Sequence, residues 1–66
     1  MKNKTKFSVT FFDKNSERID TEYYFNDPTN KEVEILAQKL EAKTGVLYYD
    51  KYNNDSYDEL VAEYEF

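Results

Sequence analysis

Carboxylates and aromatic rings share two short stretches of this sequence. Residues 20–25 hold two acidic and three aromatic residues, and residues 57–66 hold four acidic and three aromatic residues. Aromatic rings supply rigid contact area, and carboxylates can present negative charge in the manner of phosphates. This combination favours a surface that binds another protein, as an inhibitor does, over a catalytic centre.

The carboxylates could in principle do other chemistry, by holding Ca²⁺ or acting as an acid/base pair. The candidates form two clusters, one of Asp50, Asp55, Asp58 and Glu59 and one of Glu63 and Glu65. A calcium loop needs alternating oxygen ligands and a glycine at its bend, whereas residues 50–55 contain Lys51, Tyr52 and no glycine. A catalytic carboxylate pair needs a deep cleft, which a chain of 66 residues hardly builds.

The chain contains no His and no Cys, which removes the usual nucleophile and base pairs and the commonest transition-metal ligands. We therefore expect no catalytic residue, no metal and no cofactor.

Charge is distributed unevenly along the chain, whose formal net charge is −5. Residues 1–18 carry five basic and two acidic residues, and residues 19–66 carry twelve acidic and four basic residues. Nucleic-acid affinity comes largely from Lys and Arg at phosphates, so we expect no direct nucleic-acid binding. The plainer alternative is an acidic surface that only keeps a small protein soluble.

With 66 residues and no cysteine, the chain predicts a single domain, residues 1–66, that lacks the disulfides small scaffolds often use. A domain this small has marginal stability, and oligomerisation is the remaining common way to increase it. Residues 1–5 are candidates for disorder. The sequence has no apolar run of membrane-spanning length and no apolar signal region, so we expect no membrane partner and a cytoplasmic location.

The first half of the chain predicts an antiparallel hairpin. Phe7, Val9 and Phe11 alternate with polar residues, residues 13–17 form a polar turn, and alternation resumes over residues 18–25. We expect Ile19, Thr21, Tyr23 and Phe25 to lie on one face, with Ile19 and Tyr23 under the helix beside Phe7 and Val9. Phe12, Asp20, Glu22 and Tyr24 would then lie on the other face, which a second subunit could cover.

A helix follows the hairpin. Thr29 and Glu32 have the spacing of a capping box, and the alternative start is Asp27 as cap with Pro28 as the first helical residue. Val33, Leu36, Ala37 and Leu40 form the apolar stripe of this helix, and Gly45 is predicted to stop the helix as a left-handed cap. Ile35 and Ala42 fall on the outer side, where Ile35 is either a partner contact or an ordinary exposed apolar residue.

Residues 46–52 predict a strand and residues 53–55 a turn. Residues 57–66 favour a final strand, in which Leu60, Ala62, Tyr64 and Phe66 alternate with other residues; the alternative is a short helix that begins at a Ser56–Glu59 capping box. The predicted fold is α+β in the order ββαββ, an antiparallel sheet with one helix packed on it.

Three short motifs carry a family resemblance: Glu22-Tyr23-Tyr24-Phe25, Val33-Glu34-Ile35-Leu36 and Asp58-Glu59-Leu60-Val61. In the order hairpin, helix and final strand, they resemble the small dimeric uracil-DNA glycosylase inhibitors of tailed bacteriophages. The family's members mimic DNA and hold the enzyme's leucine loop in an apolar groove between two subunits. The family has aromatic residues where this chain has Val33 and Ala37, and residues 46–52 add a strand.

The resemblance implies a homodimer that inhibits host uracil-DNA glycosylase. It implies that Glu34 mimics a phosphate, that Val33 lines the groove and that Glu22 and Tyr24 lie near its rim. The expected partner-binding residues are Glu22, Tyr24, Val33, Glu34, Ile35, Asp58 and Glu59. The alternative function is a small protein-interaction module of a phage or mobile element, without an enzyme target.

Overall fold

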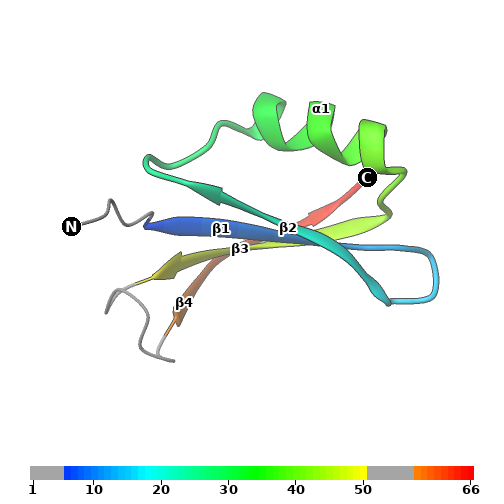
Figure 1. Ribbon diagram of the computed structural model, residues 1–66, viewed down its shortest axis with the longest axis horizontal. Helices are drawn as coiled ribbons and strands as arrows, with labels where there is room; N and C mark the ends of the chain where they lie inside the picture. Colours follow the sequence, from blue (N-terminus) through cyan, green and yellow to red (C-terminus); the bar gives the residue numbers. More distant parts are fainter. Residues whose placement is uncertain (1–5, 51–57) are drawn as a thin grey trace.

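A computed structural model describes residues 6–50 and 58–66 of the chain. It contains strands β1 (Phe7–Phe12) and β2 (Arg18–Tyr24), helix α1 (Asn30–Leu40), and strands β3 (Thr44–Asp50) and β4 (Asp58–Glu65). The strands form one antiparallel sheet in the order β2-β1-β3-β4, and α1 lies over one of its faces (Figure 1). The predicted α+β fold and its ββαββ order are confirmed. The predictions of disorder at residues 1–5 and of a turn at residues 53–55 fall outside the described residues.

The turn between β1 and β2 is organised by Asp13. Its Oδ1 accepts hydrogen bonds from the backbone N–H groups of Asn15 at 2.8 Å and Glu17 at 3.0 Å. The Asp13 N–H donates to the Glu17 carbonyl at 2.9 Å, and Ser16 takes a left-handed conformation with φ of 65°. An Asp side chain that bonds to the backbone two residues ahead is typical of tight turns. The predicted polar turn and hairpin are confirmed.

The predicted facing of β2 is wrong. Val9 pairs with Glu22 and Phe11 pairs with Asp20, so the acids and Tyr24 share the face that α1 covers. The cause is a bulge: Phe12 pairs with Arg18, which leaves Ile19 as an extra residue in β2. One extra residue moves every later side chain of a strand to the opposite face. Tyr23, expected beneath the helix, is 65% exposed.

Helix α1 begins at the predicted capping box. The Thr29 N–H donates to Glu32 Oε1 at 3.0 Å, and the Glu32 N–H donates to Thr29 Oγ1 at 3.1 Å. The alternative start at Asp27 and Pro28 is not used. The helix ends at Leu40, with Glu41 as a left-handed cap at φ 58°.

The prediction that Gly45 caps the helix is therefore wrong. Gly45 lies within β3, where it pairs with Phe11 of β1 and Tyr64 of β4. Ala42, expected on the outer side of the helix, follows its end and is buried. The expectation that a glycine ends the helix failed because a non-glycine residue, Glu41, takes the left-handed conformation that glycine adopts most readily.

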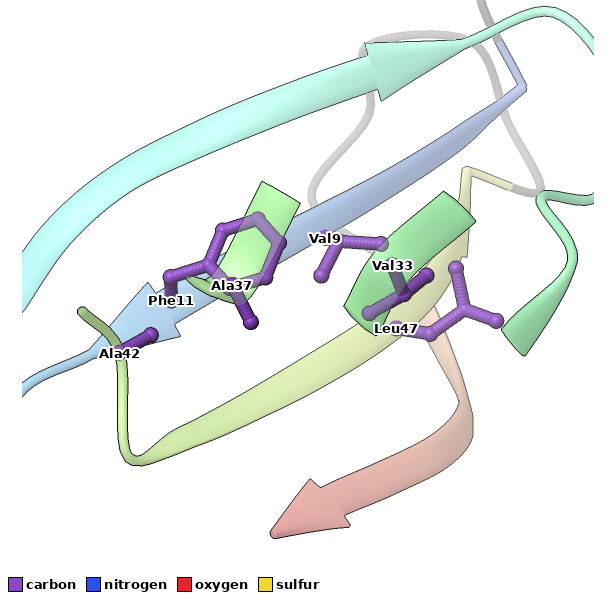
Figure 2. Close-up of a cluster of buried hydrophobic side chains, with 6 residues drawn as sticks. All are labelled: Val9, Phe11, Val33, Ala37, Ala42 and Leu47. Carbon is purple, nitrogen blue, oxygen red and sulfur yellow. The ribbon is translucent and has the colours of Figure 1, made fainter. Parts of the chain in front are cut away.

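The core lies between α1 and the central strands. Val9 and Phe11 from β1 and Leu47 from β3 meet Val33 and Ala37 from α1 (Figure 2). Ala42 closes one end of this cluster, and Leu36 and Leu40 pack against it as the predicted stripe requires. The apolar stripe of α1, which recurs every 3.6 residues, thus packs on the sheet face formed by alternate residues of β1 and β3.

The last segment of the chain forms strand β4, which confirms the predicted strand and not the alternative helix. Ala62 and Tyr64 of β4 pair with Leu47 and Gly45, which places them on the covered face. A second register shift, between Leu47 and Tyr48, pairs Tyr48 with Leu60. Leu60 therefore lies on the opposite face from Ala62 and Tyr64.

Candidate protein-binding surface

Carboxylates from three segments of the chain converge on two tyrosines. Burial raises the pKa of the Tyr24 hydroxyl above its ordinary value, and the nearby charges of Glu22 and Glu32 raise it further. Burial also raises the pKa of Tyr64, and the charge of Asp27 adds to the effect. The charge of an ionised Tyr64 also raises the pKa of Tyr24. These five residues, which we call the acidic tyrosine site, therefore share a negative local field.

Three different elements position the carboxylates of the acidic tyrosine site. The β1–β2 register places Glu22 opposite Val9, on the side of the sheet that α1 covers. Asp27 lies in the connection between β2 and α1, and Glu32 lies in the first turn of α1. The capping box holds the Glu32 carboxylate at the helix N-terminus, where the helix dipole favours negative charge.

The charges of the acidic tyrosine site remain accessible. Asp27 and Glu32 are exposed and Glu22 is half-buried. Among residues 6–49 and 59–66, no polar or charged residue is buried. Phe25, next to Tyr24 in the chain, exposes its ring to solvent. A partner could therefore contact negative charge and aromatic surface together.

Two of the predicted site residues, Glu22 and Tyr24, lie in the acidic tyrosine site. Val33 does not line a groove, because it is fully buried in the core with 0% exposure. Its position on the inner stripe of α1 points the side chain at the sheet, as Figure 2 shows. Glu34 and Ile35 are exposed on the outer side of α1, away from the core.

The last two predicted site residues, Asp58 and Glu59, begin β4 at the far edge of the sheet. Three strand spacings separate β4 from β2, which amounts to about 14 Å. Glu59 is exposed and pairs with Tyr49 of β3. Glu59 is not among the charges that raise the pKa of Tyr24 or Tyr64, so it is not part of the acidic tyrosine site.

The sequence interpretation did not place Asp27, Glu32 and Tyr64 in the site. Glu32 was assigned only a capping role, although the same hydrogen bond also fixes where its charge lies. Tyr64 could have been placed on the covered face from the alternation of β4, but its closeness to Asp27 depends on how β4 and the β2–α1 connection meet. No local sequence signal reports that contact.

The described residues also bear on metal binding and on membrane insertion. Within the described part of the chain, no group of three or more acidic side chains is arranged to hold a metal ion. No helix in those residues has the length and apolar character needed to cross a membrane. Comparisons with models of protein families, with curated proteins and with solved structures found no match to the chain.

Proposed function

We propose that this protein is a DNA-mimicking inhibitor that blocks the DNA-binding cleft of a nucleic-acid-processing enzyme. Host uracil-DNA glycosylase is the preferred target, in keeping with the motifs that resemble its phage inhibitors. The observation that supports the proposal is the acidic tyrosine site, where the charges of Glu22 and Glu32 raise the pKa of Tyr24 and the charge of Asp27 raises that of Tyr64. In this proposal the protein is a cytoplasmic binding protein without catalytic activity.

The mechanism uses charge for approach and aromatic contact for retention. An enzyme that binds DNA keeps a positively charged cleft, and opposite charge on a small protein raises the rate of encounter. Once docked, Arg and Lys of the cleft would form charge-assisted hydrogen bonds with Glu22 and Glu32. The exposed ring of Phe25 would then supply apolar contact beside those charges.

The site suits this role because its charges are positioned before binding. Glu32 is held by the capping box and Glu22 by the pairing of β2 with β1, so binding orders few groups. The Tyr24 and Tyr64 hydroxyls are protonated at neutral pH, because the ordinary tyrosine pKa is 10.0 and the local environment raises it. They can therefore offer hydrogen bonds to the enzyme without adding further charge.

The test is uracil excision by purified host glycosylase, with and without the protein. We expect inhibition that weakens as salt rises, because screening lowers charge-driven association. Glu22→Gln and Glu32→Gln should each weaken inhibition about tenfold, or about 1.4 kcal/mol. Glutamine at position 32 retains the capping box, so the variant changes charge with little change in the helix start.

Glu17→Gln is the matched control, since it removes the same charge from the exposed β1–β2 turn and should leave inhibition unchanged. Glu34→Gln separates the acidic tyrosine site from the role that the family resemblance gives to Glu34. Full excision in the presence of a micromolar excess of the protein would contradict the proposal. That outcome would favour an interaction module with a different partner.

A further inference from the structure

The face of the sheet opposite α1 is not covered by any other described element, as Figure 1 shows. We call it the open face. At one end of the strands, the register aligns Tyr23, Ser8, Tyr48 and Leu60 in a row from β2 to β4. Leu60 is 51% exposed and Tyr23 is 65% exposed. This row of the open face therefore combines two aromatic residues and Leu60 with Ser8, and the next row holds the Asp50–Asp58 pair.

The other end of the open face carries charge of opposite sign at its two edges. There the row runs through Arg18, Phe12, Thr44 and Glu65. Arg18 Nη1 donates to Thr21 Oγ1 at 3.4 Å, and Thr21 Oγ1 lies 3.1 Å from Thr10 Oγ1. These contacts place the Arg18 guanidinium on the open face at the β2 edge.

The same end of the sheet carries a hollow with two carboxylates at its β4 side. A hollow of about 690 Å³ opens there, lined by Phe12, Val46, Glu63 and Glu65 among others. A guanidinium in this hollow could lie on the Phe12 ring and face both carboxylates. Arg18 of the same chain is directed to Thr21, where its Nη1 lies 3.4 Å from Thr21 Oγ1, and it is not among the residues that line the hollow.

We infer that the open face binds a second copy of this chain about a two-fold axis parallel to the strands. Rotation about that axis places the β2 edge of one subunit opposite the β4 edge of the other. Each row then faces the same row of the partner. Arg18 of one subunit then faces Glu65 and the hollow of the other, and Tyr23 faces Leu60. Each contact occurs twice, as a two-fold interface requires.

The alternative two-fold axis, in the plane of the sheet but across the strands, gives a poor match. It would set Arg18 against the partner's Tyr23, and Glu65 against the partner's Leu60. Charges would then be buried on apolar groups, which is costly without a hydrogen-bonding partner. Only the axis along the strands pairs opposite charges and apolar side chains at once, and it agrees with the nearly aligned strands of packed sheets.

The size of the open face is sufficient for a dimer. Four strands at about 4.8 Å spacing and six residues at about 3.4 Å rise give about 19 by 20 Å per subunit. Side chains corrugate this surface, so its accessible area approaches the about 800 Å² per partner of a standard interface. Pairing through the β4 edge instead would bring Glu59, Glu63 and Glu65 against like charges.

The dimer is independent of the proposed inhibition, because the acidic tyrosine site lies on the covered side of the sheet and stays accessible. Light scattering should show a dimer at micromolar concentration. Leu60→Ser should raise the dimer dissociation constant at least about tenfold. The matched control is Ile35→Ser, because Ile35 is 54% exposed on α1, outside the open face. Circular dichroism would show that both variants are folded.

A charge exchange tests the axis itself. Arg18→Glu alone and Glu65→Arg alone should each weaken self-association, since each places like charges opposite one another. An equal mixture of the two variants should form a heterodimer, because both contacts become complementary. The double variant should also dimerise. A monomeric wild type, a dimer insensitive to Leu60→Ser, or a mixture that stays monomeric would each overturn the inference.

Discussion

Gly45→Ala tests how tightly the aromatic end of the core is packed. Gly45 lies in β3 on the covered face, and a Cβ at this position would lie 3.1 Å from Phe66 Cε2 and 3.5 Å from Phe11 Cδ1. The Phe11 ring is fully buried, while Phe66 is 37% exposed. Gly45 does not have a positive φ, so alanine meets no backbone strain. The outcome therefore depends on whether Phe66 can yield.

Two effects of opposite sign decide the magnitude. Replacing glycine by alanine within a strand stabilises by about 0.5–1 kcal/mol, because the unfolded chain loses freedom. Crowding a packed core costs about 1–3 kcal/mol. The contact at 3.1 Å is tighter than an ordinary van der Waals contact, so crowding should prevail. We expect Gly45→Ala to lower the free energy of unfolding by about 1 kcal/mol.

Phe66→Ala removes the ring that the new methyl group would meet. In that background Gly45→Ala should instead stabilise by about 0.5–1 kcal/mol, which makes the coupling between the two positions about 1.5–2 kcal/mol. Urea denaturation of the four proteins, followed by circular dichroism at one protein concentration, measures this cycle. An equal effect of Gly45→Ala in both backgrounds would refute the packing of Phe66 over Gly45.

Three further outcomes can be measured on the same protein. Thr29→Ala should lower the free energy of unfolding by about 1 kcal/mol in urea denaturation, because the helix loses its cap, and Glu32→Gln should cost less. Val33→Ala should cost about 2 kcal/mol, because Val33 is fully buried, and Ile35→Ala at most about 0.5 kcal/mol; equal losses would contradict the assigned helix face. The stability associated with the raised pKa of Tyr24 and Tyr64 should be complete below their ordinary pKa of 10.0 and fall as pH rises through the raised values. Tyr24→Phe should lessen that alkaline loss in circular dichroism, and an alkaline loss that is unchanged in this variant would contradict the burial of the Tyr24 hydroxyl.

The hairpin illustrates how a local rule can fail by one residue. Alternation in residues 18–25 predicted a strand, and that is confirmed. The same alternation assigned Ile19 and Tyr23 to the core, and that is wrong because Ile19 is the extra residue of a bulge. Without the bulge, the pairing set at Phe12 and Arg18 would have placed Ile19 opposite Phe11, as predicted. The pattern of one strand does not report how its partner meets it.

Features that depend on neighbouring residues could be predicted from the sequence alone. These are the capping box at Thr29, the inner stripe of α1 around Val33, the turn at Asp13, and the strand character of β4. Each follows from hydrogen bonds or periodicity within a few residues, so the local pattern was enough.

The tertiary structure alone decided the features that join distant segments. It buried Val33, which the family resemblance had placed in a groove, and it separated Glu59 from Glu22 by the width of the sheet. It also brought the charges of Glu22 and Glu32 to act on Tyr24 and the charge of Asp27 to act on Tyr64. The physical reason is that strand order, register and the packing of α1 set these contacts, and each depends on the whole sheet rather than on residues adjacent in the chain.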